Sequence, residues 1–148
     1  MDTIDKYFPE IENSEIVKDF FGFYPSLHDS EVIEIILNRE LGFDFSGPYL
    51  YLSLYSFDYR YQPTDFQRKN CKILMVFGGV EVHYIRNFNH QNAMADFNIE
   101  KYYSERLRRD RYMIEFGEFG GIVKFSCESI KVESIEPFTP IDYFEKTK

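Results

Sequence analysis

A histidine–aspartate pair, His28-Asp29, is the clearest candidate for acid–base or metal chemistry in the chain. Imidazole titrates near neutral pH, and an adjacent carboxylate can orient it for proton transfer or help it to bind a metal. A hydrolytic metal site needs further ligands, and the other two histidines, His83 and His90, lie in no i, i+4 ligand pair. Three interpretations stay open: a hydrolase centre, a turn whose polar groups bind the backbone, and a contact with a partner.

Motifs for other enzyme chemistry are missing from the sequence. It contains no Gly-x-Ser-x-Gly motif, no phosphate-binding glycine loop and no dinucleotide fingerprint. The two cysteines, Cys71 and Cys127, lie in apolar runs with no general base beside them, which is typical of buried thiols. One disulfide between neighbouring strands stays open as an alternative. We therefore predict a protein that is not an enzyme, with no catalytic residue, no metal and no cofactor.

A tyrosine-rich segment is the main candidate for binding a partner. Residues 49–61 alternate with a period of two, which predicts one long strand whose leucines face the core. The opposite side carries six aromatic rings with Asp58 beside them: Tyr49, Tyr51, Tyr55, Phe57, Tyr59 and Tyr61. Tyrosine is enriched at protein interfaces because it combines a large contact area with a polar tip. We expect these tyrosines and Asp58 to contact a partner, while a second core face under the helix and a small-ligand pocket stay open.

Two further segments are unusual in composition. The run from Arg106 to Arg111 holds four arginines and one acid, so it either touches phosphate or forms a solvated connection that balances acidic surface. The segment from Asn87 to Asn92 is rich in side-chain amides, which either cap turns or hydrogen-bond a partner or ligand.

The elements that position these residues are mostly strands. Periodicity predicts strands over residues 31–37, 49–61, 71–77, 80–88, 112–119, 122–127 and 130–135. Residues 93–99 are expected to form another strand, followed by an irregular or helical connection through Glu100–Arg109. Gly78-Gly79 and Gly120-Gly121 each predict a tight hairpin turn, because paired glycines supply the positive φ angles that such turns need.

A single early helix is expected from Ser14 to about Phe21, capped by Asn13 or Ser14 and ended by Gly22. Short connections between strands imply antiparallel pairing. The predicted fold class is therefore mainly β (α+β): an antiparallel meander of six to eight strands with an N-terminal helix packed on the sheet, as one domain over residues 1–148.

Composition limits the classes of partner. The 148 residues include 25 acidic and 17 basic side chains, a net charge of −8, which opposes binding to nucleic acid. Aromatic residues make up 19 % of the chain, with no Trp, which argues against intrinsic disorder. No secretory signal and no membrane-spanning run is recognisable, so we expect no membrane association and a cytoplasmic location.

Two segments of the chain form a combined motif. One leads from a glycine–aromatic–proline segment into His-Asp and the start of a strand, and the other is the Phe-Asn-x-Gln-Asn element downstream. The residues of this motif are Gly22, Tyr24, Pro25, His28, Asp29, Glu31, Phe88, Asn89, Gln91 and Asn92. With these residues the chain resembles the immunity protein 50 family of bacterial polymorphic toxin systems. In relatives we would expect Trp before the proline, where this chain has Tyr24.

This resemblance implies a single immunity-protein-like domain that neutralises a cognate toxin by stoichiometric protein–protein binding. The acidic charge favours a basic toxin surface, for example that of a nuclease-type domain. The alternative function is a small-ligand binding domain with a pocket between the helix and the sheet.

Overall fold

A computed structural model of the chain describes residues 2–39, 47–86, 94–117 and 123–138. The helical elements in these residues are η1 (Ile4–Lys6), η2 (Phe8–Glu10) and α1 (Glu15–Phe21). The strands are β1 (Asp2–Thr3), β2 (Glu31–Asn38), β3 (Tyr49–Phe57), β4 (Asn70–Gly78), β5 (Glu81–Ile85), β6 (Asp96–Ser104), β7 (Arg109–Gly117), β8 (Val123–Cys127) and β9 (Ser129–Pro137).

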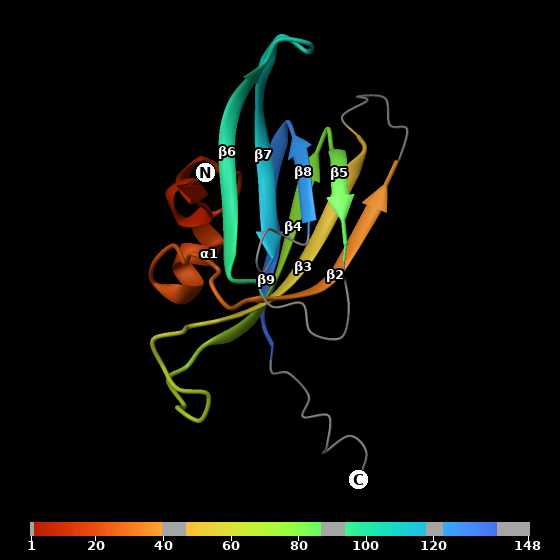
Figure 1. Cartoon of the computed structure of the whole chain (residues 1–148). Helices are drawn as coiled ribbons and strands as arrows, with labels where there is room; N and C mark the ends of the chain where they lie inside the picture. The colour runs from red at the N-terminus through yellow and green to blue at the C-terminus, as the bar shows by residue number, and fades with distance from the viewer. Residues whose placement is uncertain (1, 40–46, 87–93, 118–122, 139–148) are drawn as a thin grey trace.

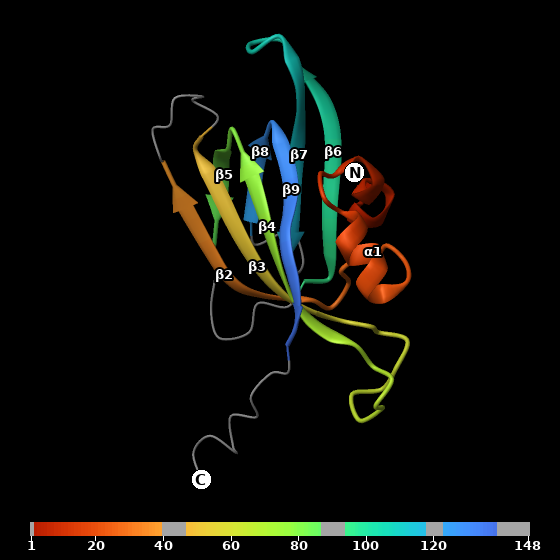
Figure 2. The ribbon, with the colours of Figure 1, turned by 180° about the vertical axis from the view of Figure 1, so that it is seen from behind.

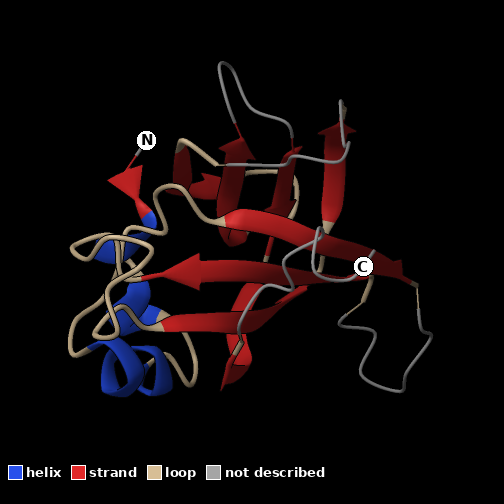
Figure 3. Cartoon of the chain, turned by 90° about the horizontal axis from the view of Figure 1, so that it is seen from below, coloured by secondary structure: helices blue, strands red, loops and turns tan. Residues whose placement is uncertain are grey.

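The strands form two packed sheets, which confirms the mainly β class. The first sheet, sheet A, has the order β1-β6-β7-β8-β5, and the second, sheet B, has the order β2-β3-β4-β9. All neighbouring strands within the sheets are antiparallel, as expected from their short connections. Figure 1 shows sheet A in front of sheet B, and Figure 3 shows the two layers from below with the helical segments at one side.

The core lies between the two sheets. Alternate side chains of each strand point inward, because successive residues of a strand face opposite sides. Sheet B contributes Leu50, Leu52, Leu54, Ile73, Met75 and Phe77, and sheet A contributes Phe97, Ile99, Ile114, Phe116, Val123 and Phe125, all of them buried. The rings of Phe77 and Phe125 meet edge to face across the layer, with 4.9 Å between their centres. Burying one such side chain contributes roughly 1.5–3 kcal/mol, so this layer is the main source of stability.

The Gly78-Gly79 turn is not a hairpin, which corrects the predicted meander. β4 pairs with β3 and β9 on its two edges, so β5 cannot join it and pairs with β8 in the other sheet. The glycine turn therefore carries the chain from sheet B to sheet A, and the Glu128-Ser129 connection carries it back from β8 to β9. Gly120-Gly121 lies outside the described residues, but the strands on either side of it, β7 and β8, are antiparallel neighbours as predicted.

The strand expected over residues 93–99 is confirmed from Asp96 onward, but the irregular or helical connection predicted through residues 100–109 is wrong. β6 continues to Ser104, a turn covers residues 105–108, and β7 begins at Arg109. Buried Phe97 and Ile99 and continuous pairing with β7 outweigh the helix-forming residues of this segment.

Helix α1 is confirmed, with Gly22 ending it at φ 86° while its N–H donates to the carbonyl of Lys18 at 2.6 Å. Neither expected side-chain cap forms: Ser14 makes no capping bond, and the Asn13 amide donates instead to the Val132 carbonyl at 2.9 Å. This bond ties the start of α1 to β9. As predicted, α1 packs against the sheet, since it contacts β9 and buries Val17 and Phe21. Figures 1 and 2 show α1 at the side of the sandwich.

A test of the connection between the sheets compares Gly79→Ala with Gly22→Ala. Both glycines have positive φ, but a Cβ at Gly22 meets open space, whereas one at Gly79 would lie 2.8 Å from Cγ of Glu128. Glu128 is ion-paired with Arg109 and Arg111, so it cannot move without breaking these contacts. In chemical denaturation we expect losses of unfolding free energy of about 1 kcal/mol for Gly22→Ala and about 3 kcal/mol for Gly79→Ala. Equal losses would contradict this account of the connection.

Candidate protein-binding face

The outer face of sheet B carries most of the tyrosines that the sequence singles out. Because Leu50, Leu52 and Leu54 are buried between the sheets, the odd-numbered residues of β3 face outward. We call this surface the tyrosine face; its residues are Tyr49, Tyr51, Ser53, Tyr55 and Phe57 of β3, Glu31, Glu34 and Ile36 of β2, Lys72, Leu74 and Val76 of β4, and Ser134 and Glu136 of β9. Figure 2 shows sheet B toward the viewer with α1 beside it. Among the described residues, no helix or strand lies over this face.

The aromatic rings on the tyrosine face form two groups. The ring centres of Tyr49 and Tyr51 are 6.4 Å apart, and those of Tyr55 and Phe57 are 5.7 Å apart. Ser53 lies between the groups and is too small to fill its position, which leaves a hollow of about 260 Å³. Its walls come from all four strands: Glu34, Ile36, Tyr51, Ser53, Lys72, Leu74, Ser134 and Glu136. Its lining combines apolar and aromatic side chains with two carboxylates and one lysine.

A second hollow, of about 220 Å³, joins the tyrosine face to the family motif. It is lined by Asp29, Glu31, Ile33, Tyr55, Phe57 and Phe138. Glu31 is the register partner of Tyr55, and the hydroxyl of Tyr55 donates to Oδ1 of Asn70 at 2.6 Å. Asp29 and Glu31 of the His-Asp segment thus lie beside Tyr55 and Phe57 of β3. No local pattern in the sequence predicts this proximity.

The His28-Asp29 pair also links the two sheets. The Asp29 N–H donates to the Met94 carbonyl and the Met94 N–H to the Ser30 carbonyl, both at 2.8 Å, and Nδ1 of His28 contacts the Ala95 carbonyl. These bonds fasten the chain before β2 to the chain before β6. Met94 and Ala95 follow the second family segment in the sequence, and its residues Phe88, Asn89, Gln91 and Asn92 lie outside the described residues.

The geometry of this pair favours a structural role over a hydrolase centre. Nε2 of His28 lies 3.5 Å from Oδ2 of Asp29, and both side chains are about half exposed. Within the described residues, no group of three His, Cys, Asp or Glu side chains is placed to hold a metal ion. Nearby in the motif, the Tyr24 ring stacks on Phe8 with 5.4 Å between the centres, and Pro25 is buried. These motif positions serve the fold, because they pack the N-terminal segment onto the sandwich.

The predicted long strand ends at Phe57, so Tyr59 and Tyr61 are not part of the tyrosine face. Asp58 turns the chain: its N–H donates to the Lys69 carbonyl at 2.9 Å, and its carbonyl accepts from the Tyr61 N–H at 3.2 Å. Its carboxylate is only 2 % exposed and accepts two side-chain bonds from Arg60, at 2.9 and 2.7 Å. These bonds lower the pKa of Asp58, although burial opposes them. Asp58 therefore holds the loop after β3.

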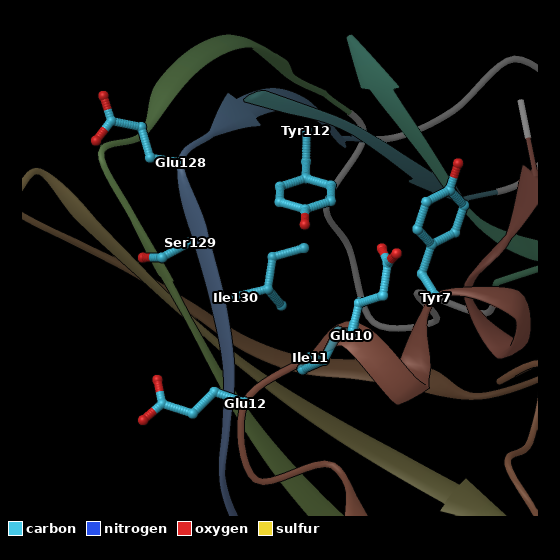
Figure 4. Close-up of a pocket in the computed structure, with 8 residues that line it drawn as sticks. All are labelled: Tyr7, Glu10, Ile11, Glu12, Tyr112, Glu128, Ser129 and Ile130. Atoms are coloured by element: carbon cyan, nitrogen blue, oxygen red, sulfur yellow. The ribbon is translucent and has the colours of Figure 1, made fainter. Parts of the chain in front are cut away.

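A hollow of about 220 Å³ near the N-terminus does not support the small-ligand alternative. It lies between the η1–η2 segment and strands β7 and β9, not between α1 and a sheet. Figure 4 shows the Glu10 carboxylate between the rings of Tyr7 and Tyr112, while Glu12 and Glu128 point away. Burial raises the pKa of the Tyr112 hydroxyl. The hollow is smaller than the roughly 300–1,000 Å³ of typical ligand sites, and three of its eight lining residues are glutamates.

Three arginines of the basic run Arg106–Arg111 form ion pairs with glutamates of the fold. Arg106 pairs with Glu81 at 2.8 Å, while Arg109 and Arg111 share Glu128 at 3.0 and 3.1 Å. Arg111 is buried and also donates to the Gly79 carbonyl at 2.8 Å. The basic run therefore makes ion pairs within the fold.

The cysteines are free thiols, as predicted, and lie in different sheets. Burial raises the pKa of both Cys71 and Cys127 to about 12. Neither thiol is a thiolate at neutral pH, so neither is set up as a nucleophile.

The ion pair in the loop gives a test that depends on pH. At pH 7 we expect Asp58→Asn to lower the unfolding free energy by roughly 1–2 kcal/mol, because a buried bidentate partner of Arg60 is lost. The stability that Asp58 adds is complete above the ordinary Asp pKa of about 3.9 and is lost as pH falls through the lowered pKa of the folded state. Wild type and variant should therefore converge in acid, whereas the exposed Asp96→Asn should match wild type throughout. A difference that stays constant with pH would overturn the assignment.

Comparison with known proteins agrees with the sequence motif. Searches of curated proteins and of solved structures gave no match. In the described part of the chain, no helix combines the length and apolar character that a membrane crossing requires. The family model for immunity protein 50 matches residues 13–138, which include both motif segments and every strand from β2 to β9. The chain therefore belongs to the immunity protein 50 family.

Proposed function

We propose that this protein is an antidote that binds a cognate toxin of a polymorphic toxin system and blocks it without catalysis. The observation that carries the proposal is the tyrosine face, an aromatic sheet surface that no described element covers. Family membership supports the role of immunity protein. We place the contact on Tyr49, Tyr51 and Tyr55, with the rest of the face around them.

The composition of the face suits a protein partner. Interfaces combine an aromatic and aliphatic centre with a polar rim, and a few large side chains in the centre carry most of the binding energy. Here Ile36, 46 % exposed, and Tyr51 border a hollow that could receive one side chain of the partner. At the centre of the outer face of sheet A, Lys124 and Glu115 lie 3.9 Å apart, and Tyr84 is the register partner of Lys124 on the next strand.

Charge suggests the kind of toxin surface. The chain carries a net charge of −8, and the tyrosine face holds Glu31, Glu34 and Glu136 against Lys72, while Lys131, the register partner of Val76, is paired with Glu133 at 3.3 Å. An acidic surface attracts a basic partner over distances near the Debye length and raises the association rate at low salt. We therefore propose a basic toxin domain, such as a nuclease-type domain, which the antidote would meet in the cytoplasm.

The first test is protection of cells. We expect co-expression of this protein with the toxin encoded by the adjacent gene to restore growth, because the antidote occupies the toxin in a stoichiometric complex. An unrelated protein of the same size and net charge is the control. Equal protection by the control would refute the proposed function.

The second test locates the contact. Ile36→Arg places a positive charge on an exposed position of the tyrosine face, and Tyr103→Arg places one on β6 of sheet A, where Tyr103 is 60 % exposed. Neither position is buried, so both variants should keep the wild-type melting temperature. Calorimetric titration with an inactivated toxin should show about thirtyfold weaker binding for Ile36→Arg, which corresponds to about 2 kcal/mol, and little change for Tyr103→Arg. The reverse order would place the interface on sheet A.

A further inference from the structure

The loop between β3 and β4, residues 58–69, carries a phenylalanine that has no role in the fold. The Phe66 side chain is 95 % exposed, the largest exposure among the large apolar side chains of the described residues. Figures 1 and 2 both show this loop, in yellow-green, extending below α1 and away from the two sheets.

The base of the loop is fastened to its surroundings by cations and aromatic rings. The guanidinium of Arg60, already paired with Asp58, lies 4.4 Å from the centre of the Phe23 ring. Arg68 lies 3.8 Å from the centre of the Phe57 ring, at the end of the tyrosine face. Nζ of Lys69 donates to the Phe20 carbonyl at 2.6 Å, which joins the loop to α1.

The tip of the loop is ordered by its own hydrogen bonds. The Asp65 N–H donates to the Gln62 carbonyl at 2.9 Å, and the Arg68 N–H donates to the Asp65 carbonyl at 3.1 Å. Oδ1 of Asp65 accepts from the Gln67 N–H at 2.8 Å. These turns enclose Phe66, so its backbone has a defined position although its ring touches almost nothing.

A ring presented in this way is suited to insertion into another protein. An exposed ring gives the free protein little stabilisation, whereas its burial removes a large apolar area from water. Since the backbone around Phe66 is already ordered, less conformational entropy is lost when a partner binds. The loop base is continuous with the tyrosine face, because Arg68 stacks on Phe57, whose ring contacts that of Tyr55.

We propose that Phe66 inserts into an apolar pocket of the toxin while the tyrosine face binds beside it; this inference rests on the proposed function. Among the side chains of the tip, Gln62, Pro63, Thr64 and Gln67 carry no charge, whereas Asp65, next to Phe66, has a carboxylate that accepts from the Gln67 N–H. The charged groups of the loop are engaged within it or with its neighbours, as Asp58 is with Arg60 and Arg68 with Phe57. The pocket that fits this tip is therefore apolar inside, sized for one ring, and rimmed by polar hydrogen-bonding groups.

Phe66→Ala tests the insertion, and the adjacent exposed Gln67→Ala is the matched control. Because the ring is almost fully exposed, Phe66→Ala should leave the melting temperature unchanged. Binding to the inactivated toxin should weaken about tenfold or more, mainly through faster dissociation, and equally at low and high salt. Phe66→Leu should recover part of the loss, while Gln67→Ala should bind like wild type.

The outcomes separate this inference from the proposed function. If Phe66→Ala binds as tightly as wild type while Ile36→Arg loses affinity, the insertion is refuted and the tyrosine face stands. If the wild-type protein does not bind the toxin at all, the proposed function fails and the insertion fails with it. If wild type forms a dimer by light scattering that Phe66→Ala abolishes, Phe66 binds a second copy of the chain, which also refutes insertion into the toxin.

Discussion

Burial of two apolar sheet faces against each other is the constraint on which the rest of the structure depends. Leu50, Leu52 and Leu54 of β3 must face Phe125 and its neighbours in sheet A, because only that layer removes them from water. Side chains in a strand alternate, so a shift of one residue would bury the tyrosines and expose the leucines. The orientation of the tyrosine face is therefore a direct consequence of how the core is packed.

The same constraint explains where the other elements lie. Since the inner faces of the two sheets pack against each other, α1 and the N-terminal segment lie at a side of the sandwich. The Asn13 amide bonds the start of α1 to β9. The His28-Asp29 segment then fastens one sheet to the other through Met94 and Ala95. The outer face of sheet B is left without a covering element among the described residues, and it is the surface on which the proposed function rests.

Local patterns predicted much of this fold, and long-range pairing decided the rest. Alternation located the strands and the helical spacing located α1, because each depends on residues close in sequence. The path through Gly78-Gly79 could not be predicted in this way: a hairpin and a crossing between sheets both need a glycine turn, and only the pairing of β4 with β3 and β9 distinguishes them. Similarly, alternation alone could not show that Asp58 and Arg60 end the strand after Phe57.

The candidate site was predicted in part for the same reasons. Tyr49, Tyr51 and Tyr55 follow from strand periodicity, and their outward orientation is confirmed. Their proximity to Glu31 and Asp29 depends on the pairing of β2 with β3 and had no local signal. Phe66 had no local signal either, because the sequence does not show whether a phenylalanine in a polar loop is buried or exposed.

The most direct measurement is site-specific photo-crosslinking to the toxin encoded by the adjacent gene. A photoreactive phenylalanine analogue at position 51 lies on the tyrosine face, and the same analogue at position 115 lies on the outer face of sheet A. The proposed interface predicts a covalent complex with the toxin from position 51 and none from position 115. Crosslinking from position 115 without crosslinking from position 51 would contradict it.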